Sequence, residues 1–181
     1  MWVAVGWGSC EPTTERDVDL PGLLESKRTA IAERWTDLAL RVYPQDSSGF
    51  IKREKDRFRN PVGHVTRASL GTLLDGLLEG RSAEEMAVAL DEIVRIRAVQ
   101  DLSPGTALGF VFLLKRAVRE ELDEATTRGS SIDFSPLDGA IDQLALHAFN
   151  RFVEQREKIY DLRVREFKRS ASRLLERLEE I

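Results

Sequence analysis

Residues 108–114 read LGFVFLL, and the eight residues that follow, 115–122, read KRAVREEL. The first stretch is apolar on nearly every side, so taken alone it fits either a buried strand or a buried helix. The second stretch alternates charge at helical spacing, which favours a helix through both. We therefore predict a helix at about 104–128 that forms the buried centre of the domain.

Helix start signals recur on both sides of this segment. Each combines a side-chain oxygen that can accept a backbone hydrogen bond with a Pro in the first turn, or with a Glu three positions further on. The signals are Asn60 with Pro61, Ser82 with Glu85, Ser103 with Pro104, and Ser135 with Pro136. They predict helices at about 61–79, which Gly80 ends, and at about 83–98, 104–128 and 136–181.

The N-terminal part of the domain is also predicted to be helical. From Pro21 onward apolar residues recur at spacings of three, four and seven, and Pro44 ends the pattern. These apolar residues are Leu24, Ile31, Trp35, Leu38 and Val42. Residues 45–60 are the strongest loop candidate, with at most two helical turns around Phe50 and Ile51. No convincing strand pattern appears elsewhere, so the predicted fold class is all-α.

Composition and charge limit the classes of function that the protein can have. The 181 residues include 27 Lys and Arg against 31 Asp and Glu, a formal net charge of -4, which excludes a protein held to nucleic acid mainly by bulk charge. No apolar stretch approaches the roughly 20 residues of a membrane-spanning helix, so we expect no membrane insertion. Residues 1–18 lack the basic start and long apolar run of a signal peptide, and we expect a flexible tail on a cytoplasmic protein.

The last predicted helix changes character along its length. Ile141, Leu144 and Ala148 form a stripe that would dock on a bundle, and a four-heptad seam follows. The seam residues are Val153, Tyr160, Val164, Phe167, Ala171, Leu174, Leu178 and Ile181. Glu157 weakens the first heptad. We predict a helical domain over 19–152 and a coiled coil over 153–181 that projects about 40 Å and pairs with a second copy of the chain.

A basic run is the first of two candidate binding regions. It contains Lys52, Arg53, Lys55, Arg57 and Arg59, and it leads into the helix start at Asn60 and His64. Free amides at a helix start favour anions, so these residues are a candidate site for an anion, a phosphate or an acidic partner. The alternative is a solvated charged turn, with His64 as a boundary residue of the helix.

The second candidate region interleaves cations with apolar residues. Arg95 and Arg97 lie among Ile and Val neighbours, so at least one of them must lie close to apolar surface. A desolvated Arg needs a carboxylate or carbonyl partner, and Asp91, Asp101 and the carbonyls at the end of the helix are candidates. Both an internal network and a ligand-binding Arg fit this pattern.

No catalytic or cofactor-binding pattern is present in the sequence. Cys10 is the single cysteine and lies in the predicted tail, and neither a Gly-x-Ser-x-Gly turn nor a Gly-rich phosphate loop occurs. The two histidines, His64 and His147, have no acidic cluster near them in the sequence, so we expect no metal site. We therefore expect a non-enzymatic protein without a cofactor.

Three stretches suggest a family: FIKREKDRFRNPVGH at 50–64, LDEIVRIRAVQDLSP at 90–104 and GFVFLLK at 109–115. Together they resemble the N-terminal sensor domain of RsbT co-antagonist proteins, the RsbRD-type domain, over about residues 22–165. The resemblance implies a globin-like helical bundle without haem that is dimeric through its last helix. In stressosome proteins that helix passes signals to a C-terminal STAS domain. The sequence ends at Ile181 with no STAS domain or kinase, so we expect a stand-alone form.

Three functions stay open at this point. One is a regulatory module that signals through the packing or rotation of its dimer seam. Another is a small-ligand or cofactor carrier, with a pocket beside the 104–128 helix and with Arg95, Arg97 or His64 holding the ligand. The third is an accessory protein of an anaerobic respiratory redox complex that docks through the basic run, since stand-alone versions of the domain resemble small proteins encoded near such complexes.

Overall fold

The computed structural model describes residues 19–43, 60–100, 102–126 and 132–179. Within these ranges the chain contains helices and no strand, which confirms the predicted all-α class. The elements are α1 (Leu20–Ser26), α2 (Arg28–Ala39), the 3-10 helix η1 (Leu40–Val42), α4 (Pro61–Leu78), α5 (Ala87–Val99), α6 (Pro104–Leu108), α7 (Phe110–Thr126) and α8 (Ser135–Glu179). The globin-like character of the bundle stays a prediction.

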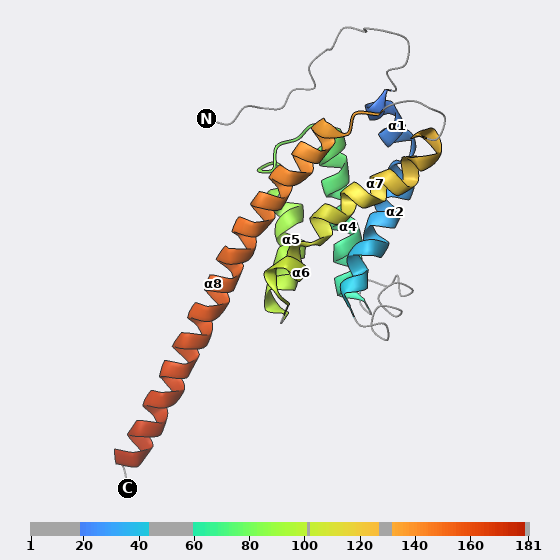
Figure 1. The fold of residues 1–181 in the computed structure, drawn as a ribbon. Helices are drawn as coiled ribbons and strands as arrows, with labels where there is room; N and C mark the ends of the chain where they lie inside the picture. Colours follow the sequence, from blue (N-terminus) through green and yellow to red (C-terminus); the bar gives the residue numbers. More distant parts are fainter. Residues whose placement is uncertain (1–18, 44–59, 101, 127–131, 180–181) are drawn as a thin grey trace.

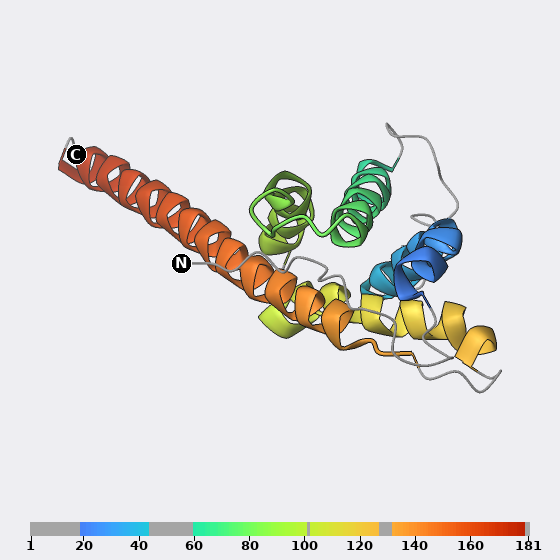
Figure 2. The same ribbon diagram turned by 90° about the horizontal axis from the view of Figure 1, so that it is seen from above.

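Five helices close into a ring around one core. α2 packs against α4 and α7, α5 packs against α4 and α8, and α7 packs against α8 (Figures 1 and 2). At the centre, the wholly buried Trp35 lies with its ring 6.5 Å from that of Phe110. The indole Nε1 of Trp35 donates a 2.6 Å hydrogen bond to the carbonyl oxygen of Phe110, so the junction of α2 and α7 is fixed by a polar contact as well as by apolar burial.

The N-terminal helix is divided where the sequence predicted one continuous element. α1 and α2 meet at Lys27, whose φ of -106° and ψ of 7° leave the helical region. Ile31 N of α2 donates a 2.9 Å backbone hydrogen bond to Lys27 O, so the helical hydrogen bonding continues from the junction into α2. η1 then ends at Val42, and the next residue, Tyr43, has the extended conformation that a following Pro favours. The predicted end of the helix before Pro44 is thus confirmed.

The segment quoted first, 108–114, is helical but is not one unbroken helix. A turn at Gly109 separates α6 from α7, although Gly109 N donates to Gly105 O at 2.9 Å and Leu113 N donates to Gly109 O at 3.3 Å. A Cβ atom at Gly109 would lie only 3.0 Å from Gly105 O, so the glycine permits this close approach. The prediction of burial on all sides is wrong for Phe112, which is half exposed beneath Lys115.

The turn between α4 and α5 contains the predicted signals at Gly80, Ser82 and Glu85, but α5 begins later than they predicted. Gly80 has a φ of 69°, and the backbone N–H of Arg81 donates to Gly76 O at 2.8 Å, which is the hydrogen bond of a Schellman motif. Ser82 and Glu85 form their reciprocal hydrogen bonds, 2.8 and 3.3 Å long. However, these bonds lie in a turn, and α5 begins at residue 87 instead of residue 83.

The longest helix, α8, begins one residue earlier than predicted and is capped by a different side chain. Ser135 is the first helical residue, and Asp133 Oδ1 accepts a 2.9 Å hydrogen bond from its backbone N–H. The hydrogen bonds with Ser135 hold the pKa of Asp133 below its usual value. Residues 1–18 and 45–59, predicted as tail and loop, lie outside the described residues.

Candidate functional site

Among the described residues, Arg97 is the charged residue that the fold buries most completely, with 2% of its surface exposed. Its guanidinium reaches two other elements from α5. Nη2 donates to the carbonyl oxygen of Ala39, the last residue of α2, and Nη1 donates to that of Ala107 in α6, both at 3.0 Å. The guanidinium carbon also lies 4.7 Å from the centre of the Phe110 ring. One side chain thus joins α2, α5, α6 and α7.

The partners of Arg97 explain how a charge is tolerated in the core. Carbonyl groups near the carboxyl ends of helices carry partial negative charge and lack intrahelical donors. Burial lowers the pKa of the Arg97 guanidinium, because its charged form loses hydration. Within the part of the chain that the structure describes, no carboxylate contacts Arg97, so its full charge is met only by dipoles and an aromatic face.

A cleft of about 330 Å³ opens beside Arg97. It lies where the end of α2, η1, α5, α6 and the start of α7 meet. Among the described residues, its lining is apolar and cationic, with no acidic side chain. The lining residues are Leu38, Ala39, Arg41, Val42, Arg97, Gly105, Thr106, Gly109, Phe110, Leu113 and Arg116. A pocket beside the predicted 104–128 helix is therefore present, and Arg97 is in its wall.

The other members of the Arg-rich region are placed differently from Arg97. Arg95 is exposed and does not line the cleft. Asp91, predicted as a partner for these cations, pairs instead with Arg151 of α8, whose Nε donates to Asp91 Oδ1 at 2.6 Å. Asp101 lies outside the described residues. The carbonyl groups that Arg97 contacts belong to α2 and α6, whereas the sequence pointed to those at the end of its own helix.

The helix α8 presents an exposed apolar face that no other described element covers. Beyond residue 159 it stands free of the bundle (Figure 1). Tyr160 and Val164 are half exposed and Phe167 is 75% exposed. Ala171 is partly buried, the side chains of Leu174 and Leu178 are not described, and Ile181 lies outside the described residues.

This exposed face begins earlier than the predicted seam. At roughly 100° per residue, Leu146, Phe149 and Val153 share the side of α8 that carries Phe167. All three are exposed although α8 is docked on the bundle here through Phe152 and other core residues. Counting heptads backward from Val153 would have found Leu146 and Phe149. Leu162 is also exposed, but it lies on the opposite side of the helix.

Polar contacts fasten α8 to α5 just before it leaves the bundle. Arg151 pairs with Asp91, and Arg156 Nη1 donates to the carbonyl oxygen of Ala98 at 3.2 Å. Arg156 also stacks on the ring of Tyr160 at 5.2 Å. Ala98 directly follows Arg97 in α5, so the same turn of α5 contacts both the cleft and α8.

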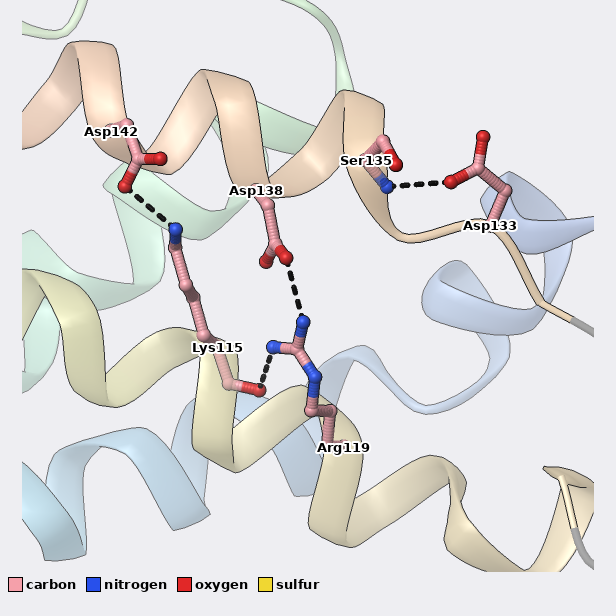
Figure 3. A network of polar contacts seen from close by, with 6 residues as sticks. All are labelled: Lys115, Arg119, Asp133, Ser135, Asp138 and Asp142. Carbon is pink, nitrogen blue, oxygen red and sulfur yellow. Dashed lines mark hydrogen bonds and ion pairs between the residues drawn. The ribbon is translucent and has the colours of Figure 1, made fainter.

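A second set of contacts joins α8 to α7 (Figure 3). Lys115 Nζ donates to Asp142 at 2.6 Å, and Arg119 Nη2 donates to Asp138 at 2.6 Å. The guanidinium of Arg119 also donates to the carbonyl oxygen of Lys115 at 3.0 Å, which holds the side chain in place. The N-terminal third of α8 is thus fixed to the bundle by two ion pairs in addition to its apolar contacts.

The predicted anion site is only partly within the described residues. Lys52, Arg53, Lys55, Arg57 and Arg59 lie outside them. Asn60 is buried and caps α4, accepting a 2.9 Å hydrogen bond from Gly63 N, while His64 is exposed. The capping bond uses one of the amides that an anion would need.

Neither histidine forms part of a metal centre in the described ranges. His147 lies on α8 with its Nε2 3.5 Å from Glu84, and His64 is on α4. Among the residues that the structure describes, no group of three or more His, Cys, Asp or Glu side chains could hold a metal ion. In the same ranges, no helix combines the length and the apolar content needed to cross a bilayer.

Comparison with models of protein families gives a match. A family model described as the RsbT co-antagonist protein rsbRD N-terminal domain matches residues 29–167, which span α2 to the free part of α8. No curated protein and no solved structure matches the chain.

Proposed function

Because the chain belongs to the family of RsbT co-antagonist N-terminal domains, which are stressosome-related regulatory domains, we propose that it is a non-enzymatic regulatory module that acts as a homodimer. In this proposal it resides in the cytoplasm, and its two copies meet along the exposed face of α8. A change in the packing or rotation of the paired helices carries the signal to a partner protein.

The observation that supports this proposal most strongly is the apolar face of α8. A monomer would leave Phe149, Tyr160 and Phe167 in water along a helix that extends about 30 Å past residue 159. Apolar residues at heptad spacing bury one another when a second helix packs alongside. A second copy of the chain supplies the same pattern, so it is the simplest partner of this face.

Small-ligand binding is the second candidate function, and the cleft beside Arg97 is the observation that favours it. The third candidate, docking on a respiratory complex through the basic run, stays a prediction because that run lies outside the described residues.

Hydrogen exchange at several protein concentrations tests the dimer. Amides of α8 beyond Tyr160 should gain protection between low and high micromolar concentration, because pairing is governed by mass action. Amides of α2 and α7, inside the ring, serve as the internal control and should not change. Phe167→Glu should remove the concentration-dependent protection, and Leu162→Glu on the opposite side should keep it. Equal exchange at every concentration in the unaltered protein would contradict the proposal.

A further inference from the structure

We propose that the cleft beside Arg97 binds a small organic monocarboxylate. In this site the carboxylate pairs with Arg97 and Arg41, and the apolar body of the ligand lies against Phe110 and Leu113. This ligand would be the signal that the proposed regulatory module senses, and that role rests on the proposed function. The binding of the ligand to the cleft does not depend on it.

The charges that line the cleft point to an anion. Of the residues that the structure describes, three arginines contribute to its wall and no acidic side chain does. Arg116 is already paired with Glu120 at 2.6 Å. Arg97 contacts two carbonyl groups, and Arg41 forms no ion pair with any described residue. Two cations therefore line one small space that no described acidic side chain lines, and an arginine fork binds a planar carboxylate in two-point fashion.

The rest of the lining points to an organic anion and not to a simple inorganic one. Leu38, Val42, Phe110 and Leu113 supply apolar surface, and Gly105 and Gly109 leave room beside it. A volume of about 330 Å³ is at the small end of ligand pockets, and with roughly 30 Å³ for each water-sized group it suits a ligand of about ten non-hydrogen atoms. A phosphate ion would leave most of this apolar surface in contact with water.

The position of the cleft links it to α8. A carboxylate bound to Arg97 would compete with the carbonyl groups of Ala39 and Ala107 for the same guanidinium. The residue after Arg97, Ala98, accepts the hydrogen bond from Arg156 that holds α8 against α5. A ligand in the cleft would therefore change the contacts of the same turn of α5 that holds α8 where it leaves the bundle.

Titration of the full chain by nuclear magnetic resonance tests the site. Benzoate and hexanoate are the probes, and benzamide and inorganic phosphate are the matched comparisons that lack the charge or the apolar body. The indole N–H of Trp35 is the reporter, because it donates to Phe110 in the cleft wall. Both carboxylates should shift this signal saturably, with a dissociation constant of about 1 mM or below. Benzamide and phosphate should each bind at least tenfold more weakly, roughly the loss of one good charged contact.

Three variants locate the site. Arg41→Gln should weaken benzoate binding about fivefold or more, whereas Arg95→Gln, on the exposed side of α5, should leave it unchanged. Gly105→Leu adds an apolar side chain to a residue of the cleft lining, where the helix can accept it because a Cβ atom meets nothing within 4 Å, and it should weaken benzoate binding. A signal from Trp35 at its original position in each free variant would show that the core is intact.

Several outcomes would overturn the assignment. They are the absence of a saturable shift with either carboxylate, equal affinity for benzamide or for phosphate, or equal effects of Arg41→Gln and Arg95→Gln. Each of these can occur while the hydrogen-exchange evidence for pairing along α8 stands. The failure of the ligand site and the failure of the dimer are therefore distinguishable.

Discussion

Arg97 shows how a single residue can hold a charge inside a helical core without a carboxylate among the described residues. Its two hydrogen bonds go to backbone carbonyls that lie 58 and 10 positions away in the sequence. The sequence allowed the prediction that at least one of Arg95 and Arg97 lies close to apolar surface. It could not reveal which one, or its partners, because backbone carbonyls are present at every position and only the packing of α2 and α6 selects these two.

Arg97→Ala should destabilise the protein strongly. The change removes two hydrogen bonds from a charged donor and the packing of the long side chain, and we expect a loss of about 2–4 kcal/mol in the free energy of unfolding. Chemical denaturation followed by circular dichroism measures it. Arg95→Ala, on the same helix but exposed, is the matched control and should change stability by less than about 0.5 kcal/mol. Equal effects of the two changes would contradict the structural role given to Arg97.

At two of the four predicted helix starts, the helices follow the local sequence signals closely. Asn60 and Ser103 cap α4 and α6 as predicted, and Gly80 ends α4. The breaks at Lys27 and Gly109 could not be predicted, because the apolar periodicity continues through both and the hydrogen bonds across them remain helical.

Replacing either of two glycines near or within α4 by alanine should change the stability of the protein, in opposite directions for the two positions. Gly80→Ala places a side chain at a φ of 69°, which disfavours the folded state by roughly 1 kcal/mol. Gly71→Ala, inside α4 with open space at its Cβ position, should stabilise the protein by about 0.5–1 kcal/mol through helix propensity. Thermal and chemical unfolding of both variants check this. A gain in stability for Gly80→Ala would be inconsistent with the observed turn.

The cap of α8 predicts a pH dependence. The pKa of Asp133 is lowered in the folded state, so its contribution to stability is complete above its unfolded pKa and is lost as the pH falls through its folded pKa. Asp133→Ala should lower the thermal midpoint at pH 6.5, and the gap to the unaltered protein should narrow as the pH falls toward 3. Asp161→Ala, exposed on the free part of α8, should show no such gap. A gap that stays constant with pH would contradict this role for Asp133.

On the scale of the whole molecule, the described residues form a closed ring of helices and one long helix that leaves it. The ring encloses one apolar core, whereas α8 keeps an apolar face exposed from Leu146 to Phe167. Heptad spacing predicted most of this face from the sequence. Its start at Leu146 was missed, because residues 137–152 also carry the inward stripe that docks α8 on the bundle.

The mass of the full chain in solution tests the central claim, pairing through α8, most directly. Sedimentation equilibrium at tens of micromolar should give about 41 kDa, twice the 20.5 kDa of one chain. Phe167→Glu should reduce the mass to that of a monomer, because a charge would be buried at the centre of the seam. Leu162→Glu, on the opposite side of the same helix, should leave the dimer intact. A mass of one chain for the unaltered protein, or a dimer that survives Phe167→Glu, would contradict pairing along this face.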